Sequence, residues 1–119
     1  MRSRTHILIG FVAFIAYSYL ISIMNKSASV PWLYGLVAVV TGSIIPDILE
    51  PATNSRHRST CHSKRALNIM VFLFGITAFV TVISLFFSHF SIIYIASCFF
   101  LGYVFHLLAD SVTPAGLPR

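Results

Sequence analysis

The residue pair with the clearest chemical potential is His106 and Asp110. They are four positions apart in an apolar stretch, so in a helix they share one face about one turn apart. At that spacing an imidazole and a carboxylate can bind one metal ion, or the carboxylate can orient the imidazole as a ligand. Gly102 lies one turn earlier on that face and would let a neighbouring helix approach closely. Alone, the pair is a weak signal, because a capped or hydrogen-bonded helix end explains most such pairs.

Two further candidate ligands lie at the ends of other apolar stretches. Asp47 closes the second stretch directly after Pro46, which ends or bends a helix and frees backbone groups for a site wall. His6 opens the first stretch. The simpler interpretations are an aspartate that faces interfacial water and a histidine that anchors the chain at the membrane interface.

The densest polar segment is 55–65, which contains two histidines and four basic residues. His57 and His62 could bind a metal. Arg56 and Arg58 suit a phosphate, because a guanidinium group matches phosphate oxygens bidentately. A basic loop that contacts anionic lipid headgroups is the alternative.

The composition indicates that membrane-spanning segments position these residues. Charged residues make up 9% of the chain and apolar residues 57%, whereas a soluble domain carries roughly 25% charged residues. No Asp, Glu, Lys or Arg occurs in 5–25, 27–46 or 66–109. A crossing needs about 20 apolar residues, so the last gap is long enough for two, with the polar residues 88–91 as the turn. A cleaved signal peptide is the alternative for the first stretch, although its apolar run is long for one.

The sequence therefore predicts one all-α domain over 1–119, an integral membrane bundle of four transmembrane helices. The expected spans are 7–24, 30–48, 66–87 and 91–109, and the expected polar site loop is 50–65.

Charge distribution predicts the orientation of the bundle. Four crossings place both termini and the 50–65 loop on one side, which receives seven of the eight basic residues and leaves only Lys26 on the other. By the positive-inside rule that side is cytoplasmic. The three carboxylates of the chain and all histidines except His89 map to the same side. Ionisable residues at membrane depth are costly, so their gathering at one face indicates a functional site. No nucleic-acid partner is expected, because no basic helix or aromatic platform accompanies the charge.

Six candidate metal ligands converge from the ends of the four expected helices. They are His6, Asp47, His57, His62, His106 and Asp110. Imidazole and carboxylate together suit zinc or another divalent first-row ion. More than four ligands permit two ions, an arrangement common in phosphoester hydrolysis.

In their order along the chain, the polar segments resemble those of the YdjM-like family of LexA-regulated, membrane-bound metal-dependent hydrolases. The matching segments are Thr5-His6, 42–47 (GSIIPD), 56–63 (RHRSTCHS) and 102–118 (GYVFHLLADSVTPAGLP). The resemblance implies an inner-membrane, divalent-metal hydrolase of a phosphoester or phospholipid, with the six candidate ligands at motif positions. Cys61 departs from the pattern, since threonine is usual before the His-Ser pair, and it could add a soft ligand.

The expected reaction is metal-assisted hydrolysis at the level of the lipid headgroups, where membrane lipids are the partners. Zinc, as one or two ions, would activate water, and Arg56 and Arg58 would hold the phosphate. Asp110 or Glu50 would be the general base, with Glu50 the freer of the two if Asp110 binds metal. One alternative is a non-catalytic protein in which a closed metal shell only ties the helices together. The other is a small channel or holin-like protein without metal, which would carry polar residues along its spans.

Overall fold

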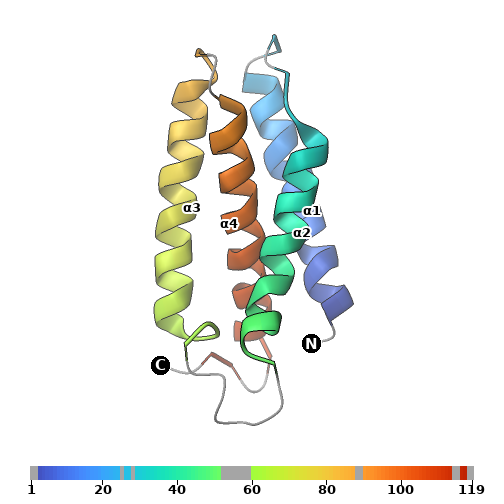
Figure 1. The fold of residues 1–119 in the computed structure, drawn as a ribbon, viewed down its shortest axis with the longest axis vertical. Coiled ribbons are helices and arrows are strands. Elements are labelled where there is room, and N and C mark those ends of the chain that lie inside the picture. The colour runs from blue at the N-terminus through green and yellow to red at the C-terminus, as the bar shows by residue number, and fades with distance from the viewer. Residues whose placement is uncertain are drawn as a thin grey trace.

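The computed structural model describes residues 3–24, 26–27, 29–51, 60–87, 90–113 and 116–117. It contains four helices, α1 (Ser3–Met24), α2 (Trp32–Leu49), α3 (Lys64–Ser84) and α4 (Phe90–Ser111) (Figure 1). Each is long and apolar enough to cross a membrane, and the described residues form no strand. The predicted all-α fold with four transmembrane helices is therefore confirmed.

Helix α4 is the centre of the bundle. It packs against α1, α2 and α3, and α1 also packs against α2 (Figure 1). Helix α3 contacts mainly α4, and only Thr81 and Ser84 are buried along it. The outer faces of α1, α2 and α3 therefore present large apolar side chains to the bilayer, as lipid-facing helices require.

The ends of the helices fall on two levels. The first turns of α1 and α3 and the last turns of α2 and α4 lie together at one end of the bundle, here called the site end (Figure 1). An even number of antiparallel spans produces this arrangement. The polar ends of all four helices can therefore supply side chains to one place.

Two glycines bring the backbones of α2 and α4 into contact. A Cβ atom on Gly102 would overlap the carbonyl oxygen of Val39, and one on Gly42 would overlap the carbonyl oxygen of Phe99. Small residues allow this approach between membrane helices, where packing replaces the hydrophobic effect as the attractive force. The contact fixes the depth of α2 relative to α4 one turn before His106.

Away from the site end, hydrogen bonds between side chains join α1 to α4. The hydroxyl of Tyr17 lies 2.8 Å from the Ser97 hydroxyl, and Ser18 pairs with Tyr94. The rings of Tyr17 and Tyr94 also stack, with centroids 6.0 Å apart. In a medium without water these pairs satisfy buried hydroxyl groups and hold α1 in register with α4.

Candidate metal centre

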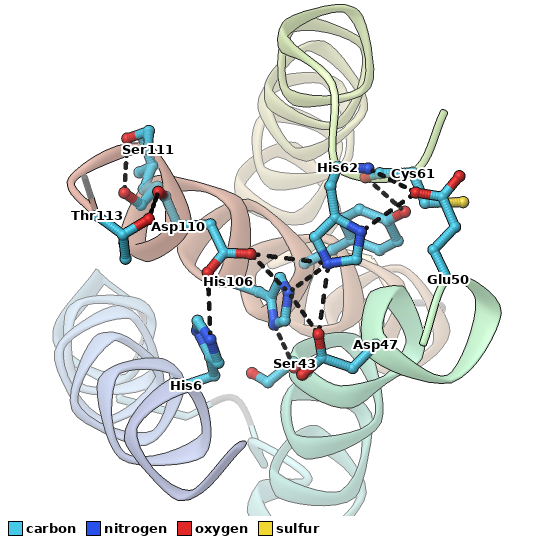
Figure 2. Close-up of polar contacts among 12 residues, drawn as sticks. His6, Ser43, Asp47, Glu50, Cys61, His62, His106, Asp110, Ser111 and Thr113 are labelled. Carbon is cyan, nitrogen blue, oxygen red and sulfur yellow. Dashed lines mark hydrogen bonds and ion pairs between the residues drawn. The ribbon is translucent and has the colours of Figure 1, made fainter. Parts of the chain in front are cut away.

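Five ionisable side chains from all parts of the bundle meet at the site end (Figure 2). The ligand cluster consists of His6 from α1, Asp47 from α2, His62 from the turn before α3, and His106 and Asp110 from α4. All except Asp47 are buried, and the Asp47 side chain is 37% exposed. Polar groups buried together in an apolar bundle must satisfy one another or a bound partner, because isolated burial is costly.

Helix capping places His62 at the edge of the cluster. The Ser63 hydroxyl accepts a hydrogen bond from the backbone N–H of Ala66 at 3.1 Å, so Ser63 is the N-cap of α3. The same hydroxyl donates to the carbonyl of Thr60 at 2.9 Å. Serine satisfies a free N–H of the first helical turn in this way. His62 is thus fixed immediately before the helix begins.

The Nδ1 atoms of His62 and His106 each face a hydrogen-bond acceptor on the far side of the ring from the cluster. Nδ1 of His106 lies 2.7 Å from the backbone carbonyl of Ser43, which can only accept, so Nδ1 carries the proton. Nδ1 of His62 lies 3.3 Å from a carboxylate oxygen of Glu50, to which it can donate, and Nε2 of the same ring lies 3.4 Å from a carboxylate oxygen of Asp47. In a neutral imidazole the other nitrogen then offers a lone pair. With both Nδ1 atoms protonated and both rings neutral, both Nε2 atoms face the cluster as acceptors.

These two acceptors lie only 3.2 Å apart, and two carboxylate oxygens lie beside them. Oδ1 of Asp47 is 3.4 Å from Nε2 of His62 and 3.6 Å from Nε2 of His106. Oδ2 of Asp110 is 3.7 Å and 3.5 Å from the same two atoms. Ligand atoms that share one zinc ion at a tetrahedral angle, with bonds of about 2.0–2.2 Å, are roughly 3.3–3.6 Å apart. The separations fit neighbouring ligands of a single small cation.

His6 extends the cluster on the side of α1. Its Nε2 lies 3.4 Å from Oδ1 of Asp110, and its ring lies 4.1 Å from the ring of His106, centroid to centroid. Its Nδ1 is buried and finds no hydrogen-bond partner in the described part of the chain. Asp110 thus turns one oxygen towards His6 and the other towards His62 and His106 (Figure 2).

Two groups of side chains could each hold a metal ion, and they overlap. One is His6, Asp47 and His106, and the other is His62, His106 and Asp110. Nδ1 of His106 is hydrogen-bonded to a backbone carbonyl, so only its Nε2 can bind a metal, and one nitrogen binds one ion. Because both groups include His106, they are parts of one centre, and His106 cannot be a ligand of two ions at once.

Glu50 lies behind His62, on the side away from the other members of the cluster (Figure 2). Its Oε1 accepts the backbone N–H of Thr60 at 3.0 Å, and its Oε2 accepts both the backbone N–H and the ring N–H of His62 at 3.3 Å. Burial raises the pKa of the Glu50 carboxyl, but hydrogen bonds from Cys61, His62 and Thr60 outweigh that effect and hold the pKa below its usual range. A carboxylate held by several donors orients His62, which favours a positioning role over the expected role as general base.

Replacing Glu50 by Gln tests this role. A hydrogen-bond partner of a metal-binding histidine typically contributes about ten- to a hundredfold to metal affinity, and we expect Glu50→Gln to weaken metal binding by about that factor in a titration with a metal buffer. A general base predicts the contrary pattern, in which metal affinity stays at the wild-type level and turnover alone is lost.

The remaining predicted site residues are not all part of this arrangement. Arg56, His57 and Arg58 lie outside the described residues. Cys61 belongs to neither group of close ligand atoms, and its carbonyl accepts a hydrogen bond from the Tyr103 hydroxyl at 3.4 Å.

Two features of the α2 backbone, the carbonyl of Ser43 and the course of the helix at Pro46, were not predicted from the residue types. The orienting carbonyl of Ser43 was not predicted, because a sequence gives no sign of which backbone oxygen a side chain will meet. Helix α2 continues through Pro46 to Leu49, so this proline does not end the helix. The continuation keeps Asp47 on a regular helical turn, where its carboxylate lies beside the two histidines of the cluster centre.

Comparison with known proteins agrees with the resemblance of the polar segments. Residues 1–119 match the family described as YdjM inner membrane protein. No curated protein and no solved structure matches the chain. The family name and the four apolar helices indicate a multi-pass protein of the inner membrane. The chain belongs to the YdjM inner membrane protein family.

Proposed function

We propose that this protein is a divalent-metal-dependent hydrolase that cleaves a phosphoester, in particular that of a phospholipid headgroup. One observation carries the proposal: the Nε2 atoms of two imidazoles lie 3.2 Å apart, with carboxylate oxygens beside both. Acceptors gathered without a donor among them repel one another unless a cation lies between them. Nitrogen and oxygen ligands at these separations suit zinc.

Three members of the cluster would hold the ion, namely His62, His106 and Asp47, which leaves one position for water or substrate. When bound, such an ion supplies Lewis-acid chemistry, since it activates water and polarises a phosphoryl oxygen. His6 would hold the second oxygen of Asp110 or bind a second ion. Asp47, the exposed member, leaves one side of the cluster open to water and substrate. Asp110 is the remaining candidate for the general base.

Two hydrogen bonds prepare the imidazoles for this role. The ring of His106 donates to the Ser43 carbonyl, and the ring of His62 donates to Glu50. Both bonds keep the imidazole in the tautomer that binds metal through Nε2. The histidines would therefore need no rearrangement when the ion enters.

Position and charge favour a lipid phosphate as the group that is attacked. The cluster lies where the apolar helices end, which is the level of lipid headgroups in a bilayer. The number of spans assigns seven of the eight basic residues of the sequence to the same side, and the positive-inside rule then assigns that side to the cytoplasm. We propose that Arg56 and Arg58 bind the phosphate and offset its charge in the transition state.

The test is hydrolysis by purified protein in proteoliposomes that contain a phospholipid with a fluorescent headgroup. Release of the label is expected with zinc and is expected to stop with a chelator. Arg56→Lys and Arg58→Lys keep the charge but lose the bidentate fork, so each should slow release about a hundredfold and leave metal content unchanged. In inverted inner-membrane vesicles, whose outer leaflet is the cytoplasmic one, the label should appear in the external medium.

A metal-binding protein without activity is the second candidate, and the burial of every cluster residue except Asp47 favours it. In that case the ion would tie the four helix ends together with a closed set of ligands. Zinc-loaded, folded protein that releases no label from any phospholipid would support this candidate and refute the hydrolase.

A further inference from the structure

A cavity of about 470 Å³ lies between the start of α3 and Tyr103 of α4. Cys61 and Ser63, the chain neighbours of His62, both line it, and so does Tyr103, which precedes His106 by three positions on α4. Its volume falls in the range of about 300–1,000 Å³ that is usual for small-molecule sites. None of the five residues of the ligand cluster is among the lining residues, but chain neighbours of His62 are.

The lining of this cavity is polar at one end and apolar at the other. Ser63 and Arg65 contribute polar groups from the start of α3, whereas Ile69 and Met70 lie about one helical turn further along. Arg65 is exposed, and it forms no ion pair with a carboxylate of the described residues. Ile69 is 56% exposed, so the apolar end opens towards the surrounding lipid. We call this cavity the lipid groove.

We infer that the lipid groove docks one anionic phospholipid, with its headgroup at Arg65 and an acyl chain against Ile69 and Met70. Charge complementarity selects the headgroup, because the guanidinium at the rim attracts an anion. The apolar half selects a membrane lipid over a free phosphate ester, which would leave that half unoccupied. This binding does not rest on the proposed function.

A fluorescent reporter in the groove tests the binding directly. Trp32, the only tryptophan, lies at the start of α2, at the end of the bundle opposite the site end (Figure 1), and Trp32→Phe removes its signal. Adding Ile69→Trp places a fluorophore at the groove. In proteoliposomes, brominated phosphatidylglycerol should quench it several-fold more than brominated phosphatidylcholine at the same fraction. Val71→Trp is the matched control, because Val71 is exposed on α3 but does not line the groove, and the two lipids should quench it equally.

Two charge variants then assign the preference to one side chain. Arg65→Gln should abolish the preference for the anionic lipid. Lys64→Gln removes the same charge from the adjacent exposed position, which does not line the groove, and should retain the preference. Equal quenching by the two lipids in the Ile69→Trp variant would overturn the inference. The inference would also be overturned if Lys64→Gln lost the preference for the anionic lipid to the same extent as Arg65→Gln. That result would mean that any positive charge at the start of α3 attracts anionic headgroups.

Metal content measured in the same samples keeps this inference separate from the proposed function. We expect Arg65→Gln to retain the metal of the wild type, because Arg65 lies outside the ligand cluster. A preference for the anionic lipid in protein that binds no metal would support the groove and contradict the hydrolase. Loss of both the metal and the preference in Arg65→Gln would overturn the groove as a separate site.

Discussion

Replacing His106 by Ala is expected to remove bound metal from the protein and to make its stability insensitive to chelators. His106 provides the Nε2 atom that lies within 3.6 Å of ligand atoms on His62, Asp47 and Asp110, so its loss leaves the others without their common neighbour. A ligand that binds only the folded state stabilises it by about 2.7 kcal/mol when present at about a hundred times its dissociation constant. Wild-type protein should therefore lose roughly this amount on treatment with a chelator, whereas the stability of His106→Ala should not change.

Elemental analysis and thermal unfolding in detergent, with and without chelator, measure the two effects. Ser97→Ala is the matched control, since Ser97 is also buried on α4 and its hydroxyl lies 2.8 Å from that of Tyr17. This variant should unfold at a lower temperature but keep its metal and its response to the chelator. Wild-type metal content in His106→Ala would remove His106 from the centre, and no metal in wild-type protein under any loading condition would remove the centre altogether.

The sequence predicts the membrane fold and the gathering of polar residues, because both depend on charge and on the number of spans. Gaps without charged residues define four spans, and an even number of spans brings His6, Asp47, His62 and Asp110 to one end. The structure places these four side chains and His106 close together. Their roles as metal ligands stay a prediction.

The packing of the helices could not be predicted in the same way. In a soluble helix the apolar stripe identifies the buried face, but here lipid and bundle interior are both apolar and the stripe disappears. Nothing in the sequence therefore marks α4 as central or α3 as peripheral. The expected third span also reached residue 87, whereas α3 ends at Ser84 and the chain then turns.

The hydrogen bonds made by the Glu50 carboxylate could not be predicted from the residue types either. Glu50 was expected to be free for base catalysis, because it is the one carboxylate outside the predicted ligand set. In the structure the N–H groups of Thr60 and His62 meet its side chain. These N–H groups belong to residues 10 and 12 positions further along the chain, and that separation gives no sign of the contact. The role of a carboxylate near such a site is thus decided by the donors that surround it.

The close contact between α2 and α4 leads to the second large effect, which is a loss of stability in Gly102→Ala. The added methyl group would overlap the carbonyl oxygen of Val39, and a backbone atom cannot move aside without moving its helix. Overpacking of this kind typically costs about 1–3 kcal/mol, and rigid backbone places this case at the upper end. Gly75→Ala is the matched control, because nothing lies within 4 Å of the position that its methyl group would occupy on α3. That variant should be neutral or more stable by up to about 1 kcal/mol.

The same substitution should also weaken metal binding, although Gly102 is no ligand. Its added methyl group would press on the segment of α2 from Val39 to Ser43, and the Ser43 carbonyl holds Nδ1 of His106 at 2.7 Å. A shift of α2 would lengthen that hydrogen bond and move Asp47 away from the two histidines. Unfolding in mixed detergent and metal titration of the folded fraction measure the two effects on one sample. If Gly102→Ala unfolds like wild type, the helices do not touch there. If it is less stable but binds metal with wild-type affinity, the close contact holds the fold together without setting the geometry of the centre.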